Sequence, residues 1–152
     1  MEAALRSAHY LITGSNPEPE AFKVVREKDE QMPWRDAEIN IGGVVIKTAV
    51  ASGLGNARKL IEALKAGDVS YDFAEIMACP GGCSGGGGQT IHDGCDMTRQ
   101  RGQALYSDDA RQQLRFSHEN PDVREVYKTF LEKPLSHKAH ELLHTEQKFW
   151  DL

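Results

Sequence analysis

The spacing of apolar residues predicts two helices and two strands in the first two thirds of the chain. Residues 2–12 and 54–66 each place apolar side chains on one helical face, and each is followed by a glycine that can end a helix. The β-branched and apolar segments at 43–51 and 71–79 are typical of buried strands. Strand, helix and strand in this order form a βαβ unit, so we expect the two strands to be parallel and joined by a right-handed crossover.

The remaining segments predict loop and helix. Residues 15–37 carry three prolines and many charges, which predicts a loop with one short helical piece near 22–25. Helices are expected near 95–106 and, more briefly, near 108–115. Two further helices should begin at the caps Asn120, which precedes a proline at the first helical position, and Ser136. The predicted fold class is therefore α/β, a βαβ unit of a partly parallel sheet with a mostly helical C-terminal wrap.

Composition and charge narrow the class of protein. Of the 152 residues, 39% are hydrophobic and 27% charged, which is typical of a globular domain, and the net charge of −5 argues against a nucleic-acid partner. No apolar run approaches the roughly 18 residues that a membrane-spanning helix needs, so no membrane partner is expected. The N-terminal residues do not resemble a signal peptide, and three cysteines are an odd number. We therefore expect a reducing, cytoplasmic location.

The segment EIMACPGGCSGGGGQT, residues 75–90, carries the candidate chemistry. Cys79 and Cys83 are four apart, and six of the twelve residues from Cys79 to Thr90 are glycine. Glycine lets a backbone turn sharply and brings its N–H groups close to a bulky anion. A phosphate loop would need a Gly-Lys-Ser/Thr sequence that does not follow here, whereas an iron–sulfur cluster takes cysteine thiolates and accepts N–H bonds. Two buried core cysteines are the plain alternative.

The number of cysteines limits what this chain holds alone. A cubane cluster needs four thiolates, and only two cysteines lie in the glycine-rich segment. Cys95 follows twelve residues after Cys83 and is either a third ligand or, as we favour, a free thiol. From its residues alone, the chain supplies about half of a cluster site.

The segment resembles the third cysteine motif of the iron-only (di-iron) hydrogenase large subunit, E-x-M-A-C-x-G-G-C-x-x-G-G-G-Q. Every specified position is present, and the one departure is Thr90, where the family usually has proline. The first helix, the βα unit and the segments RGQALYSDD, SHENPDVREVYKTFLEKPLS and AHELLHT also resemble the family, so the likeness covers essentially the whole chain. It divides the chain into a large-subunit part, 1–106, and a small-subunit-like helical tail, 107–152.

The resemblance implies a role for each matching residue. Cys79 would ligate a 4Fe-4S cluster, and Cys83 would ligate that cluster and bridge it to a di-iron subsite with CO and cyanide ligands. Met77 would pack beside the di-iron subsite, at the catalytic position. The glycines that would let the backbone close around the cofactor are Gly81, Gly82, Gly86 and Gly87.

The resemblance also implies that the site is shared. The family's other two cysteine motifs are absent from these residues, so the chain resembles the C-terminal third of a catalytic domain. We expect reversible oxidation of dihydrogen to protons and electrons, in anaerobic hydrogen metabolism, only with the N-terminal part of the hydrogenase or a partner chain that supplies the missing ligands. The electron carrier would be ferredoxin or an NAD(P)H-linked subunit. Alone, the chain should be inactive.

Other interpretations stay open. A non-catalytic hydrogenase-like protein of iron–sulfur assembly or sensing shares the C-x3-C and glycine pattern, and a split or decayed gene product would keep only an interaction surface. Asp72 and Glu75 are either proton-relay carboxylates or solvent-facing strand residues. The histidine face at 137, 140 and 144 is either a metal site or, as we favour, a solvated helix face.

Overall fold

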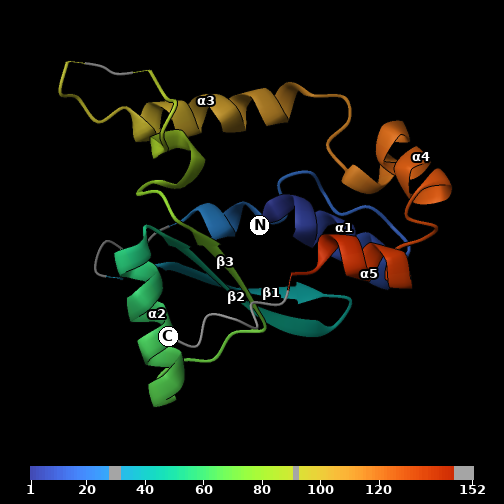
Figure 1. The fold of residues 1–152 in the computed structure, drawn as a ribbon, viewed down its shortest axis with the longest axis horizontal. Coiled ribbons are helices and arrows are strands. Elements are labelled where there is room, and N and C mark those ends of the chain that lie inside the picture. The colour runs from blue at the N-terminus through green and yellow to red at the C-terminus, as the bar shows by residue number, and fades with distance from the viewer. Residues whose placement is uncertain (28–31, 91–92, 146–152) are drawn as a thin grey trace. The chain divides into compact units, whose positions relative to one another are not determined.

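The structure is a computed structural model that describes residues 1–27, 32–90 and 93–145. It divides into two compact units, residues 1–115 and 116–152. Figure 1 shows that the first unit holds the β-sheet and helices α1 to α3, and that the second holds the shorter helices α4 and α5. The cysteine motif belongs to the first unit.

Three strands form the described sheet, in the order β1-β2-β3. Strand β2, Val44–Ser52, and strand β3, Phe73–Met77, pair in parallel, which confirms the predicted βαβ arrangement. Strand β1, Arg35–Ile41, pairs antiparallel with β2 in a register that runs from Arg35 opposite Val50 to Ile41 opposite Val44. The sheet is therefore mixed, as the expected fold class requires.

Strand β1 corrects one sequence expectation. Its first residues fall within 15–37, which the prolines and charges had predicted to be loop. Exposed and less exposed side chains alternate along this segment instead. Asp36 and Glu38 point to one face of the strand, and the buried Ile39 and Ile41 point to the other. Gly42 and Gly43 then close a two-residue hairpin, with φ angles of +60° and +91° that side-chain-bearing residues rarely adopt.

Helix α2, Leu54–Ala66, connects the two parallel strands and ends at Gly67 in the left-handed conformation, as predicted. Ala57 and Leu60 are its buried residues. Other apolar side chains of α2 and β3 are exposed: Leu54 (68%), Ile61 (46%), Leu64 (38%), Phe73 (43%) and Ile76 (46%). Both elements therefore carry apolar surface that the rest of the described chain leaves uncovered.

The sheet has a small core on each face. Helix α1, Glu2–Thr13, contributes Leu5 to one cluster, where it joins Phe22 and Ile41. A second cluster holds Trp34, Ala49 and Leu60. Ile46, which packs on the first cluster, and Ala49 are three residues apart on β2 and so point to opposite faces.

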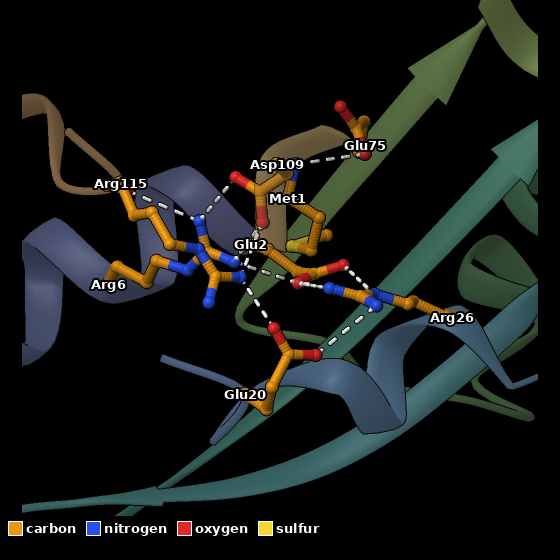
Figure 2. Close-up of polar contacts among 8 residues, drawn as sticks. All are labelled: Met1, Glu2, Arg6, Glu20, Arg26, Glu75, Asp109 and Arg115. Carbon is orange, nitrogen blue, oxygen red and sulfur yellow. Dashed lines mark hydrogen bonds and ion pairs between the residues drawn. The ribbon is translucent and has the colours of Figure 1, made fainter. Parts of the chain in front are cut away.

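Helix α3, Thr98–Arg111, replaces the two helices expected at 95–106 and 108–115 with one. A group of charged side chains ties its end to α1 and to the short 3-10 helix η1, Lys23–Arg26 (Figure 2). The ion pairs run between Arg6 and Asp109, Asp109 and Arg115, Arg115 and Glu20, Glu20 and Arg26, and Arg26 and Glu2. Residues far apart in sequence are thereby held together within the first unit.

The second unit contains the 3-10 helix η3, Ser117–Glu119, and two α-helices. Helix α4, Pro121–Thr129, begins at Asn120, whose side chain accepts a hydrogen bond from the Asp122 amide. Helix α5, His137–Leu143, begins at Ser136, which caps the Ala139 amide. Both predicted caps are confirmed. Among the described residues, no helix is long and apolar enough to span a membrane.

Candidate metal centre

The cysteine motif begins where the two parallel strands end. Met77 is the last residue of β3, and its carbonyl accepts a hydrogen bond from the Gly53 amide, just after β2, at 2.8 Å. Cys79 follows two residues later, and the Gly82 amide donates to its carbonyl at 3.0 Å to close a tight turn. A single-turn 3-10 helix, η2 at Gly82–Gly85, carries Cys83. The motif thus occupies the carboxyl edge of the sheet, where open α/β sheets place their ligands.

Several glycines of the motif are required by the backbone path. Gly81 and Gly82 have φ angles of +74° and +67°, and a Cβ atom on Gly82 would lie 2.7 Å from Met77 Sδ. A Cβ atom on Gly85 would lie 2.2 Å from the Pro80 carbonyl oxygen. Both distances are shorter than packed atoms allow. A larger residue at Gly85 would displace backbone, whereas one at Gly82 would displace the Met77 side chain and would also have to adopt a positive φ. Gly87, in contrast, has open space around it.

The two cysteines of the motif have different surroundings. Cys79 is partly buried, and Gly86 passes close to it, since a Cβ atom on Gly86 would lie 3.3 Å from Cys79 Sγ. Cys83 is exposed, and its carbonyl accepts a hydrogen bond from Gln89 Nε2 at 3.0 Å. All three cysteines are free thiols, the form from which thiolate ligands arise.

Two thiols can supply half of the ligands of a cubane iron–sulfur cluster. Among the described residues, no three His, Cys, Asp or Glu side chains are grouped closely enough to hold a metal ion, so Cys95 is not gathered with Cys79 and Cys83. Cys95 is exposed near the Asp93 carbonyl. Cysteine thiols and a loop without side chains beside Cys79 suit an iron–sulfur cluster. Because a cubane cluster needs four ligands, two of them must come from outside these residues.

The carboxylates considered for proton transfer have partners in the structure. Asp72 Oδ2 accepts a hydrogen bond from the Lys47 amide at 2.8 Å and so caps the start of the β2–β3 pairing. Glu75 Oε2 accepts one from the Met1 ammonium group at 3.1 Å, as Figure 2 shows. Both side chains therefore help to hold the fold.

The histidines predicted on one helical face lie in the second unit. The rings of His140 and His144 stack with centroids 4.6 Å apart, although α5 ends before His144. His137 is almost fully exposed, and its Nδ1 atom is 4.0 Å from Glu141.

Residues from α3 complete the surroundings of the loop, and the sequence motif did not indicate them. Thr98 lies against the turn, because a Cβ atom on Gly81 would be 2.3 Å from its methyl carbon. Arg101 donates hydrogen bonds to the carbonyls of Ser84 and Thr90. Nothing in residues 98–101 alone marks them as neighbours of the cysteines.

Comparison with known families defines the class of protein. Residues 1–87 match the family model of the iron only hydrogenase large subunit, C-terminal domain, and residues 95–148 match that of the iron hydrogenase small subunit. The chain belongs to the iron-only hydrogenase family.

Individual relatives agree with this assignment. The chain is 46% identical over 146 residues to the NADP-reducing hydrogenase subunit HndD of Solidesulfovibrio fructosivorans, which covers 95% of the chain and 24% of that protein. It is 32% identical over 149 residues to mouse cytosolic iron-sulfur assembly component 3, which covers 96% of the chain and 30% of that protein. The chain thus spans less than a third of the length of each of these relatives.

A solved structure shows the same fold. The solved structure is the [FeFe]-hydrogenase HydA1 from Chlamydomonas reinhardtii with one glutamate replaced by alanine. It superimposes on this chain with a TM-score of 0.76 at 39% identity. The match covers 96% of this chain and 43% of that one.

Proposed function

We propose that this chain supplies Cys79 and Cys83 to the active-site cluster of an iron-only hydrogenase that reversibly oxidises dihydrogen. The observation that carries the proposal is the placement of two free thiols, four residues apart, in a glycine-rich turn at the carboxyl ends of two parallel strands. When bound, a 4Fe-4S cluster joined to a di-iron subsite with CO and cyanide ligands would supply the hydrogen and electron chemistry. Both thiols would serve as thiolate ligands, with Cys83 at the bridge.

The loop around the thiols suits a bulky anion. Cys83 is exposed, so its sulfur is open to a group that approaches from outside the described chain. Gly86 and Gly87 carry no side chain that would exclude such a group, and Gly87 has open space around it. Met77 packs against Gly82 at the end of β3, which supports the proposal that its thioether would pack beside the di-iron subsite.

The site needs ligands from a second polypeptide segment. Two thiols cannot hold a cubane cluster by themselves, so we assign the other ligands to the N-terminal part of the hydrogenase or to a partner chain. The exposed apolar side chains of α2 and β3 support this assignment, because such a surface is typical of an interface. The chain alone is expected to be inactive, and ferredoxin or an NAD(P)H-linked subunit is the proposed electron carrier. The cytoplasmic location and the anaerobic setting stay predictions.

A second function has specific support. The mouse relative is named as an iron-sulfur assembly component, so a non-catalytic role in assembly or sensing is the alternative. The two functions differ in the di-iron subsite, whose CO and cyanide ligands absorb in a distinct region of the infrared.

A chimera tests the proposal. This chain would replace the homologous 146-residue segment of the Solidesulfovibrio hydrogenase subunit, expressed with the machinery that matures the parent enzyme. We expect infrared bands from iron-bound CO and cyanide, together with hydrogen evolution. A chimera that binds a 4Fe-4S cluster without those bands would favour the assembly or sensing role. Failure to bind any cluster, when the parent subunit does, would refute both.

A further inference from the structure

The first turns of α3 contact the loop that carries the cysteines. Figure 1 shows the start of α3 beside the segment that follows β3. Thr98 packs against Gly81 and Gly85, since Cβ atoms on these glycines would lie 2.3 Å and 3.0 Å from its side chain. Gly102 faces Ser84, whose Oγ atom would be 3.6 Å from an added Cβ. Gly102 therefore lies within van der Waals range of the loop.

Arg101 joins the two ends of the glycine run. Its Nη1 atom donates to the Ser84 carbonyl at 3.5 Å, and its Nη2 atom donates to the Thr90 carbonyl. The planar guanidinium presents several N–H donors in a rigid fork, so one side chain can hold two carbonyls at a set separation. Residues 85–88 are all glycine and have no side chains of their own to pack.

We propose that Arg101 is a positioning residue that holds the glycine run over Cys79 and thereby sets the geometry of the two cysteine ligands. Glycine loses more conformational freedom on ordering than any other residue, so this run needs contacts from outside itself. Arg101 supplies two of them, one directly beside Cys83 and one at the far end of the run. Gly86, between these ends, is the residue that approaches Cys79 Sγ.

The inference adds a role for the small-subunit part of the family. Arg101 lies in residues 95–148, which match the small-subunit model, whereas Cys79 and Cys83 lie in residues 1–87, which match the large-subunit model. The small-subunit part would therefore help to build the ligand site. The positioning itself is a property of this chain's residues, and its importance for a cluster rests on the proposed function.

Alkylation of the metal-free chain of residues 1–152 tests the positioning. The rate of Cys79 modification by iodoacetamide would be measured by peptide mass spectrometry and divided by the rate at Cys95, which is exposed and lies outside the glycine-rich loop. In Arg101→Ala we expect this ratio to rise about fivefold, the change that corresponds to losing roughly 1 kcal/mol of hydrogen bonding to the loop. Arg99→Ala, two residues earlier on the same helix and exposed, is the matched control and should leave the ratio unchanged.

A conservative variant separates positioning from folding. Arg101→Lys keeps the charge but lacks the fork, so its ratio should fall between those of the wild type and Arg101→Ala. If the alanine variant loses its helical circular dichroism, the lysine variant carries the test. Ratios equal to wild type in folded Arg101 variants would overturn the inference.

The outcome is independent of the proposed function. Because alkylation needs no metal, an Arg101 effect in a chain whose chimera binds no cluster would retain the positioning role and reject the hydrogenase role. A chimera with CO and cyanide bands but no Arg101 effect would support the hydrogenase role and reject the positioning role.

Discussion

Arg6 donates hydrogen bonds to both carboxylate oxygens of Asp109, at 3.1 and 3.0 Å, although 103 residues separate them in sequence. The pair joins α1 to the end of α3, and Figure 2 shows that Arg115 approaches the same carboxylate. Arg6 lies in the large-subunit match and Asp109 in the small-subunit match. The two family segments therefore meet within the first compact unit through opposite charges.

Arg6→Met should destabilise the first unit by about 1–3 kcal/mol in urea unfolding. Removal of one partner of a buried pair costs roughly 3–5 kcal/mol, and the lower range applies here because the Asp109 side chain is 35% exposed while that of Arg6 is 4% exposed. Arg111→Met is the control. Its pair with Asp108 spans 3.9 Å between exposed side chains and should change stability by less than about 0.5 kcal/mol. Equal losses in the two variants would contradict a special role for the Arg6 pair.

Stability should fall at acidic pH through the same group of charges. The hydrogen bond from Arg6 lowers the pKa of Asp109, and the hydrogen bond from Arg115 lowers the pKa of Glu20. A carboxyl whose pKa is lower in the folded state stabilises that state fully above its unfolded pKa, about 4, and loses this contribution as the pH falls through the folded pKa. Unfolding in urea at pH 7, 5, 4 and 3 should thus show a decline mainly below about pH 4.

The variant Asp109→Asn gives the matched acid series. It should be less stable than the wild type at pH 7, and the difference should shrink toward pH 3, since the removed carboxylate no longer contributes there. A constant difference across the series would exclude Asp109 as a source of the acid dependence.

Gly85→Ala should disturb the cysteine loop, whereas Gly87→Ala should not. The added methyl at position 85 would lie 2.2 Å from a backbone oxygen, while nothing lies within 4 Å at position 87. We expect a loss of about 1–3 kcal/mol for the first, as for other overpacked sites, and little change for the second. Urea unfolding measures both. Similar behaviour of the two alanine variants would be inconsistent with the described path of the loop.

Cysteine variants in the chimera should separate ligands from bystanders. Cys79→Ser and Cys83→Ser should each lower the iron content and remove the cluster signal in electron paramagnetic resonance, because serine is a poor substitute for a thiolate ligand. Cys95→Ser should retain both, since Cys95 is not grouped with the other two. Iron loss in the Cys95 variant would instead identify a third ligand.

The exposed apolar face of α2 should contribute to assembly more than to folding. Ile61→Gln should change the unfolding free energy of the isolated chain by less than about 0.5 kcal/mol, because the side chain is already exposed, but it should weaken association with a separately expressed N-terminal hydrogenase fragment. Leu60→Ala, on the buried side of the same helix, should cost about 2–5 kcal/mol of stability. Unchanged association of the Ile61 variant would remove α2 from the interface.

Local signals explain which parts of the fold could be predicted. Gly14, Gly67, Asn120 and Ser136 mark helix ends through their own backbone or side-chain chemistry, and all four are confirmed. The sequence does not indicate the start of strand β1, because the alternation of apolar and polar residues is short and includes several charged residues. The sequence indicates two helices in place of the single helix α3, because α3 has few apolar residues and none of its residues is buried.

The site could be predicted only as far as it is local in sequence. The βαβ pattern predicts Cys79 near the end of β3, and the glycines beside it predict a tight turn there. The contacts of Arg101 arise from how α3 returns to the loop, which depends on packing rather than on any nearby pattern. The same holds for the pairing of Arg6 with Asp109.

Helix α3 has consequences for the order in which the site is completed during synthesis. Arg101 at its start contacts the cysteine loop, and Asp109 near its end contacts α1, so both of its partners precede it in the chain. A ribosome releases the two cysteines before the helix that holds their loop. The cysteine loop therefore lacks the two hydrogen bonds from Arg101 until α3 has been synthesised and has folded back onto it.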